Sequence, residues 1–303
     1  MRYVVTGAAG FIGSHLAEAL QEQGHDVVGI DCFTDYYDLQ VKAENARALD
    51  VRRLDLAEDE LDFDGLDGVF HLAGQPGARS FGTVFGDYVR RNLLATQRVF
   101  EAAAATRVRV VFASSSSIYG DAEAYPTPEE TTPAPLSPYG VTKLGCEHLA
   151  RAYATSFGLD VVVLRYFTVY GPRQRPDMAI ARIVEALASG GVYELYGDGS
   201  NSRSFTYVGD AVEATIAAMD GGAGTYNVGG GDEASFLEVI AMLERISGRA
   251  LAVRRAPAAA GDVRRTRADV SRIERDLGWR PRVGLEDGLH AQWKWAAGRV
   301  GAR

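Results

Sequence analysis

A tyrosine and a lysine stand four positions apart in the segment Ser137-Pro138-Tyr139-Gly140-Val141-Thr142-Lys143. Ser137 can cap the start of a helix and Pro138 suits its first turn, so we expect Tyr139 and Lys143 on one helix face. A phenol ionises near pH 10 in water, and a neighbouring ammonium favours the phenolate that acts as a base. The pair therefore predicts a proton-transfer site, although this spacing also arises by chance on many helices.

A glycine-rich turn follows the first predicted strand, Tyr3 to Val5. It reads Thr6-Gly7-Ala8-Ala9-Gly10-Phe11-Ile12-Gly13 and leads into a predicted helix. Such a turn offers unpaired backbone N–H groups and the positive end of the helix dipole to a pyrophosphate. Glycine turns also occur for purely structural reasons, but this position after the first strand favours a dinucleotide. The predicted contacts are Gly7, Gly10, Phe11, Ile12 and Gly13.

The second predicted strand ends at Asp31. A carboxylate there accepts both ribose hydroxyls of an adenosine and repels a 2′-phosphate, so NAD is favoured over NADP. The alternative is a side chain that only caps the next loop. A nicotinamide cation near Tyr139 would favour its phenolate further. The loops after the third and fourth strands add Asp55, Leu56, Leu72, Ala73 and Gly74 as expected contacts to adenine and ribose.

Short β-branched runs alternate with longer helical patterns over the first half of the chain. The predicted strands are 3–5, 26–30, 68–72, 109–113 and 160–164, and the predicted helices are 12–23, 38–49, 88–105 and 138–156. This alternation predicts a Rossmann-type α/β fold with a doubly wound parallel sheet. After about residue 165, clustered glycine and proline predict a smaller substrate-binding domain. We expect residues 1–165 to bind NAD, with later strands at about 204–228 returning to this domain, and residues 166–303 to form most of the discontinuous second domain.

The composition is that of a soluble enzyme and excludes several other classes. The 303 residues carry a formal charge of −8 without a basic stripe, which argues against nucleic acid and anionic membranes as partners. No apolar run reaches the roughly 18 residues that cross a bilayer. Cys32 and Cys146 predict free thiols in a reducing cytoplasm. The five histidines form no ligand spacing, so we expect no metal.

Together these motifs resemble the extended short-chain dehydrogenases/reductases, the group that contains nucleotide-sugar epimerases, dehydratases and decarboxylases. The resemblance includes TGAAGFIG at Thr6, HLAGQ at His71, SSSSIYG at Ser114, YFTVYGPR at Tyr166, SRSFTYVGD at Ser202 and LGWRP at Leu277. It implies that Tyr139 is the acid/base, that Lys143 is its partner, and that Ser115 hydrogen-bonds the sugar hydroxyl being oxidised. We also assign Lys42, Asn92 and Tyr166 to the cofactor.

Two serines narrow the reaction that the resemblance implies. Dehydratases of the group carry Asp-Glu directly after the serine or threonine position, and decarboxylases carry Glu in the second place, whereas this chain has Ser116 and Ser117. The resemblance then implies oxidation of a UDP-sugar at carbon 4 and return of the hydride to either face, which is 4-epimerisation. The alternatives are a decarboxylase or dehydratase with its extra acid/base elsewhere, or a non-catalytic NAD-binding regulator.

Three stretches resemble UDP-glucuronate 4-epimerases. They are Asp35-Tyr36-Tyr37-Asp38 followed by Lys42, the pattern H-L-A-x-Q-x-G-x-R from His71 to Arg79, and Arg175-Pro176-Asp177-Met178-Ala179. Oxidised glucuronate is a β-keto acid, which loses carbon dioxide unless fixed donors hold its carboxylate near the plane of the ketone. We expect this clamp to consist of Ser116, Ser117, Thr168 and Arg175. The alternatives are a solvated rim charge or a phosphate contact for Arg175, a hydroxyl satisfied by the strand-end backbone for Thr168, and a polar strand end without a specific ligand for the two serines. Neutral UDP-sugars, glucose/galactose or xylose/arabinose, are the alternative substrates.

The remaining contacts also follow from the resemblance. Arg203 resembles an arginine that meets the diphosphate, with a structural salt bridge as the alternative, and Asp262 resembles a contact to the uridine ribose. Arg79 completes the expected UDP-sugar contacts. Relatives are usually dimers through the helices at 88–105 and 138–156, so the resemblance implies a homodimer.

Overall fold

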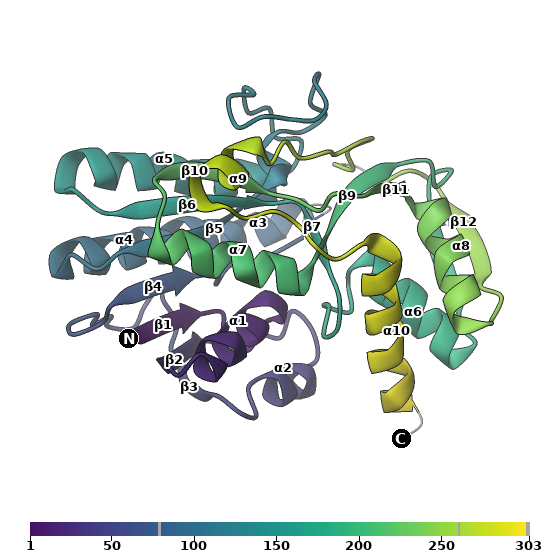
Figure 1. Ribbon diagram of the computed structural model, residues 1–303, viewed down its shortest axis with the longest axis horizontal. Helices are drawn as coiled ribbons and strands as arrows, with labels where there is room; N and C mark the ends of the chain where they lie inside the picture. Colours follow the sequence, from purple (N-terminus) through teal and green to yellow (C-terminus); the bar gives the residue numbers. More distant parts are fainter. Residues whose placement is uncertain (78–79, 260, 301–303) are drawn as a thin grey trace.

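A seven-stranded sheet forms the centre of the computed structural model, which describes residues 1–77, 80–259 and 261–300 (Figure 1). Its strand order is β10-β6-β5-β4-β1-β2-β3, and each pair of adjacent strands is parallel. The strands are β1 (Arg2–Thr6), β2 (Asp26–Asp31), β3 (Asp50–Arg53), β4 (Gly68–His71), β5 (Val110–Ser115), β6 (Val161–Tyr166) and β10 (Gly224–Val228). The sheet confirms the predicted Rossmann-type α/β fold.

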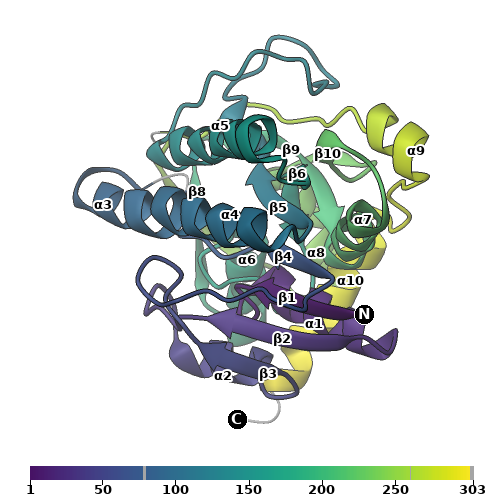
Figure 2. The same ribbon diagram turned by 90° about the vertical axis from the view of Figure 1, so that its left-hand side faces the viewer.

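Helices cover both faces of the sheet (Figure 2). One face carries α1 (Phe11–Glu22) and α7 (Val208–Asp220), and the other carries α4 (Ala95–Thr106) and α5 (Pro138–Phe157). Side chains of a strand alternate between the faces, so Tyr3 and Val5 of β1 join the apolar core under α1 and α7, whereas Val4 joins the core under α4 and α5. Further helices are α2 (Leu39–Asn45), α3 (Phe85–Tyr88) and α9 (Ser271–Leu277).

The ends of the helices follow from local sequence at several points. Ser137 caps α5 by accepting a hydrogen bond from the Gly140 N–H at 3.1 Å, as predicted, with Pro138 in the first turn. Gly158 ends the helix at φ +69°, in the left-handed region that favours glycine. The helix expected over 88–105 is divided differently, because a π-helical stretch, η2 (Val89–Leu94), separates α3 from α4.

A smaller unit packs against one end of the sheet (Figure 1). Its sheets are β11-β9-β7 and β12-β8, and α6, α8 and α10 share with them a separate apolar core. The elements are β7 (Thr168–Tyr170), α6 (Ala179–Ser189), β8 (Val192–Tyr196), β9 (Ser202–Tyr207), β11 (Glu233–Ser235), α8 (Phe236–Ser247), β12 (Ala252–Ala256) and α10 (Leu285–Val300). Within the segment 204–228, β10 joins the main sheet and α7 covers it, while β9 pairs in the smaller sheet.

The strand order reverses direction beside β1, whose neighbours are β2 and β4. In doubly wound sheets a ligand binds outside the carboxyl ends of the strands at such a point. Thr6, Asp31 and His71 end the three strands there. Among the described helices, none has the length and apolar character that would cross a membrane.

Candidate active site

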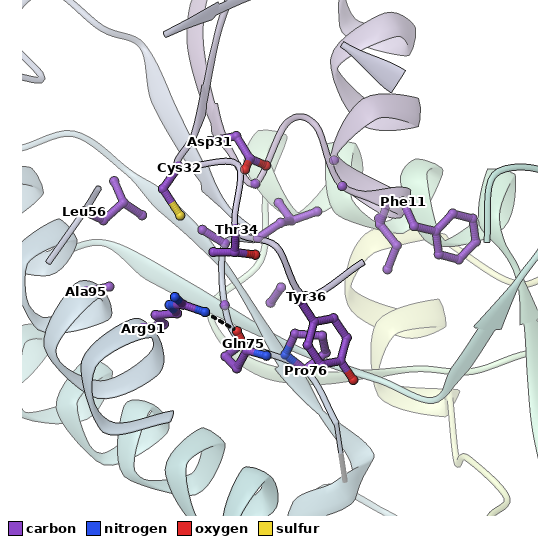
Figure 3. A pocket seen from close by; sticks show the side chains of 18 of the residues that line it. Phe11, Asp31, Cys32, Thr34, Tyr36, Leu56, Gln75, Pro76, Arg91 and Ala95 are labelled. Carbon is purple, nitrogen blue, oxygen red and sulfur yellow. Dashed lines mark hydrogen bonds between the residues drawn. The ribbon is translucent and has the colours of Figure 1, made fainter. Parts of the chain in front are cut away.

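A pocket opens at the carboxyl ends of the central strands (Figure 3). All of the predicted cofactor residues except Asn92 line it. The lining includes Gly7, Gly10, Phe11, Ile12, Gly13, Asp31, Lys42, Asp55, Leu56, Leu72, Ala73, Gly74, Tyr139, Lys143 and Tyr166. The structure thus brings the glycine turn and the predicted acid/base pair into one cavity.

The glycine turn has the geometry that a pyrophosphate requires. Gly7 has φ +72°, and a Cβ there would lie 2.9 Å from the backbone nitrogen of Ala73. A Cβ on Gly13 would lie 2.2 Å from the Gly7 carbonyl oxygen, so both positions accept only glycine without backbone movement. Gly10 begins α1 with no side-chain cap, which leaves the amides of the first turn to a ligand.

Asp31 holds the loop that follows β2. Its carboxylate is 9% exposed and accepts the N–H groups of Ala9 at 3.2 Å and Phe33 at 2.8 Å. The ammonium of Lys42 lies 4.0 Å from Asp31 and donates to the Thr34 hydroxyl at 2.9 Å. Burial lowers the pKa of Lys42, and the Asp31 charge opposes that shift. A carboxylate oxygen has two lone pairs, so Asp31 can cap this loop and still accept ribose hydroxyls. These residues fit the adenosine half of NAD.

Tyr139 and Lys143 both face the pocket from α5. Lys143 is buried, and its ammonium donates to the carbonyl oxygen of Ala113 at 2.7 Å. The ring of Tyr88 lies 6.2 Å from the ring of Tyr139, centroid to centroid. A phenol and a buried ammonium that line one pocket are suited to take a proton from a bound hydroxyl.

Asn92 is placed behind the pocket wall. It is 1% exposed, and its Oδ1 accepts the N–H of Gln75 at 2.7 Å. Its Nδ2 donates to the Gln75 carbonyl oxygen at 3.2 Å and to the Thr142 hydroxyl at 3.1 Å. Asn92 thus joins the loop after β4 to the helix that carries Tyr139 and Lys143.

The serine run lies at the end of β5. The hydroxyl of Ser115 caps the short 3-10 helix η3 (Ser116–Ile118), accepting the N–H of Ser117 at 3.1 Å, and donates to the Ser117 hydroxyl at 3.1 Å. Ser114 lines the pocket, whereas Ser115, Ser116 and Ser117 do not. Thr168 also lies outside the lining, at the start of β7.

Arg175 enters the same pocket from the segment before α6. Its Nε and one terminal nitrogen donate to Asp177 at 3.0 and 3.1 Å. The hydroxyl of Tyr36 donates to the same carboxylate at 3.3 Å. The basic side chain therefore reaches the cavity that holds Tyr139 and Lys143.

Comparisons with known proteins agree with this geometry. A model of the "NAD dependent epimerase/dehydratase family" matches residues 3–229. The chain belongs to this family. The match confirms the resemblance predicted from the motifs, and NAD is the cofactor.

Three proteins illustrate how similar this epimerase/dehydratase is to known members. A Bacillus subtilis (strain 168) protein named "Uncharacterized UDP-glucose epimerase YtcB" is 42% identical, covering 95% of this chain and 96% of that protein. The crystal structure of a Bacillus cereus UDP-glucuronic acid 4-epimerase with UDP-glucuronic acid and NAD is 38% identical, with a TM-score of 0.95, over 99% of this chain and 100% of that one. The structure of MoeE5 with UDP-glucuronic acid and NAD is 42% identical, with a TM-score of 0.90, and the match covers 99% of this chain and 100% of MoeE5.

The two residues assigned to the UDP end of the epimerase/dehydratase site form an ion pair with each other. A terminal nitrogen of Arg203 donates to Asp262 at 2.8 Å, and their side chains are 8% and 17% exposed. A structural salt bridge was the alternative to a diphosphate contact for Arg203, and the structure contains such a bridge. Neither residue lines the pocket described above. Arg79 lies outside the described residues.

Several pocket residues were not singled out from the sequence. Figure 3 shows Arg91 donating to the side chain of Gln75, and the two atoms lie 2.8 Å apart. Arg91 and Gln75 both line the pocket. Tyr36 and Tyr37 also line the cavity. Both tyrosines lie in the motif that resembles UDP-glucuronate 4-epimerases, and this motif was the signal for them, whereas nothing local distinguishes Arg91.

His71 is buried beside the site, where its imidazole is uncharged at neutral pH. Its two ring nitrogens lie 2.8 Å from the Thr6 hydroxyl and 3.0 Å from the Thr96 hydroxyl. Burial, with the charge of Lys143 adding to it, lowers the pKa of His71 to about 3. In the part of the chain that the structure describes, no three histidine, cysteine or acidic residues cluster as metal ligands would.

Proposed function

We propose that this protein is an isomerase that epimerises a UDP-sugar at carbon 4, with UDP-glucuronate and UDP-galacturonate as its substrate pair. The observation that carries the proposal is the meeting of Tyr139, Lys143 and Arg175 in one pocket with the glycine turn. Two of the similar structures hold UDP-glucuronic acid with NAD, which supports the same choice.

Tyr139 removes the proton of the sugar 4-hydroxyl and returns it after epimerisation. The glycine turn and Asp31 would hold NAD, which would supply the acceptor for the hydride of carbon 4. Lys143 is the charged partner of Tyr139 on the same helix, and Ser115 hydrogen-bonds the reacting oxygen. The 4-keto sugar must turn over about its diphosphate before the hydride returns to the opposite face. The protein supplies position and charge in this scheme.

A carboxylate clamp protects the oxidised sugar. The 4-keto acid loses carbon dioxide when the bond to its carboxylate stands perpendicular to the ketone. We propose that Arg175 donates to the carboxylate, and that Ser116, Ser117 and Thr168 complete the clamp. Ser116 and Ser117 also occupy the positions where related dehydratases and decarboxylases carry catalytic carboxylates, so this strand end has no such acid/base.

A neutral UDP-sugar is the second candidate substrate. The B. subtilis relative is named for UDP-glucose, and MoeE5 has also been solved with UDP-glucose and NAD. A pocket of this type can therefore hold a hexose with no carboxylate.

The UDP half of the substrate is assigned to the smaller unit. We propose that Arg203 meets the diphosphate and that Asp262 accepts a ribose hydroxyl, with Arg79 as a further contact. The Arg203–Asp262 pair then loosens or rearranges when UDP binds. In this division residues 1–165, with β10, serve NAD, and most of residues 166–303 serve the UDP-sugar.

A homodimer through the helices at 88–105 and 138–156 is part of the proposal. Four large apolar side chains of this region are exposed in the monomer, which supports burial by a second copy. They are Val89, Leu94, Val141 and Phe157. A cytoplasmic location also stays a prediction, supported by the free thiols of Cys32 and Cys146.

The direct test incubates purified protein with UDP-glucuronate, first without and then with added NAD. Anion-exchange chromatography and proton NMR resolve the products. UDP-galacturonate that approaches a constant ratio supports the proposal, and turnover without added NAD indicates a retained cofactor. Epimerisation of UDP-glucose alone would favour the second candidate and contradict the clamp.

A further inference from the structure

The ion pair of Arg175 and Asp177 uses only one edge of the guanidinium. Nε of Arg175 lies 3.0 Å from one carboxylate oxygen of Asp177, and a terminal nitrogen lies 3.1 Å from the other. A guanidinium has five N–H donors in one plane, so its second edge, formed by the two terminal nitrogens, can take another carboxylate. Arg175 lines the pocket and Asp177 does not.

Tyr36 also bonds Asp177, at the carboxylate oxygen that the terminal nitrogen of Arg175 contacts. Its hydroxyl donates to the carboxylate at 3.3 Å. Burial, with the charge of Asp177 adding to it, raises the pKa of Tyr36 to about 12, so this hydroxyl stays a donor at neutral pH. Tyr36 belongs to the loop that Asp31 caps, on the cofactor side of the pocket. Asp177 therefore lies between the cofactor loop and the arginine that serves the substrate.

We propose that Asp177 is a positioning residue that selects anionic sugars. It orients Arg175 so that the second edge of the guanidinium meets the carboxylate of a UDP-hexuronate, and it does not touch the sugar itself. This inference rests on the proposed function. The side chains of Arg175 and Asp177 are 24% and 32% exposed, so both are partly accessible to solvent.

Loss of orientation has a chemical consequence that can be measured. When the carboxylate of the 4-keto acid rotates out of the ketone plane, the bond between carbons 5 and 6 breaks and carbon dioxide leaves. The electron pair of that bond forms an enolate, which takes up one proton at carbon 5. The ratio of carbon dioxide to epimer therefore reports how well the carboxylate is held.

The test compares Asp177→Asn and Tyr36→Phe with the wild-type holoenzyme. Asparagine keeps the size of the side chain but offers one acceptor oxygen and no charge. We expect Asp177→Asn to raise KM for UDP-glucuronate about tenfold and to raise carbon dioxide per epimer several-fold, with kcat/KM for UDP-glucose within about twofold of wild type. We expect Tyr36→Phe to raise KM for UDP-glucuronate and carbon dioxide release by smaller factors. Asp177→Glu, which keeps the charge, should bring both quantities part of the way back to wild type.

Glu286→Gln is the matched control, because this carboxylate pairs with Arg245 at an exposed position away from the pocket. A lower KM for UDP-glucuronate in Asp177→Asn would mean that Asp177 competes with the sugar, and would overturn the proposal. Unchanged KM and carbon dioxide release, or an equal loss for both sugars with a lower Tm, would overturn it as well. A wild-type protein without UDP-glucuronate turnover refutes the proposed function itself, whereas an unchanged variant of an active enzyme refutes only this inference.

Discussion

The ammonium of Lys143 donates a hydrogen bond of 2.7 Å to the carbonyl oxygen of Ala113. Ala113 belongs to β5 and Lys143 to α5, so the bond ties the helix of the acid/base pair to the strand that ends at Ser115. The ammonium also lies 4.9 Å from the ring centre of Phe112. Lys143 is 5% exposed, so its charge acts on the pocket with little screening by water.

Replacing this lysine tests the role of its charge. Lys143→Met removes the ammonium and keeps most of the apolar stem. We expect kcat to fall by at least about 100-fold, since positioned acid/base catalysis contributes 10²–10⁴-fold. Steady-state epimerisation measures the effect, with circular dichroism as the check on folding. A folded variant whose kcat stays within about tenfold of wild type would show that the charge is dispensable.

The carboxylate of Asp31 is expected to determine cofactor affinity. Asp31→Asn keeps an oxygen for the Phe33 N–H but loses the charge that strengthens bonds to ribose hydroxyls. We expect the Kd for NAD to rise about tenfold and the preference over NADP to weaken. Calorimetric titration of the apoprotein measures both. Asp26→Asn, at the exposed start of the same strand, is the control, and an equal change in the two variants would argue against a ribose contact.

Arg175→Ala tests the choice between anionic and neutral sugars. Without the guanidinium we expect kcat/KM for UDP-glucuronate to fall about 100-fold, because a charge-assisted bidentate contact is lost. Turnover of UDP-glucose should change by no more than about threefold. Arg254→Ala, at an exposed position of β12, serves as the control. Equal losses for both sugars would exclude Arg175 as the specificity residue.

The buried His71 predicts how stability depends on pH. Its pKa is about 3 in the folded protein, lowered by burial, and near 6.5 in an unfolded chain. Between these values the unfolded state binds the extra proton, so stability falls as the pH drops. Between pH 7 and pH 5 the free energy of unfolding of the wild type should fall by about 2 kcal/mol more than that of His71→Gln. Urea unfolding at both pH values checks this, and parallel losses would refute it.

Features that depend on neighbouring residues could be predicted from the sequence. Ser137 caps α5 because a hydroxyl at this position meets an amide three residues ahead, and the same local rule puts Tyr139 and Lys143 on one face. Asp31 ends β2 directly after the residues Val27 to Ile30, as predicted. In contrast, the division of helix 88–105 by a π-helical stretch has no comparable local signal.

Features that join distant parts of the chain needed the structure. Asn92 meets Thr142 across 50 residues, and Tyr36 meets Asp177 across 141. No spacing in the sequence predicts such pairs. The cofactor contact of Asn92 stays a prediction, and the structure adds that its amide bonds Gln75 and Thr142.

The central claim is that the hydrogen on carbon 4 leaves and returns within one active site. The most direct measurement epimerises UDP-glucuronate labelled with deuterium at carbon 4, in ordinary water, and locates the label by NMR. The account predicts UDP-galacturonate that keeps its deuterium at carbon 4, and a Tyr139→Phe variant with little turnover. Exchange of that deuterium for solvent hydrogen, or inversion at another carbon, would contradict it.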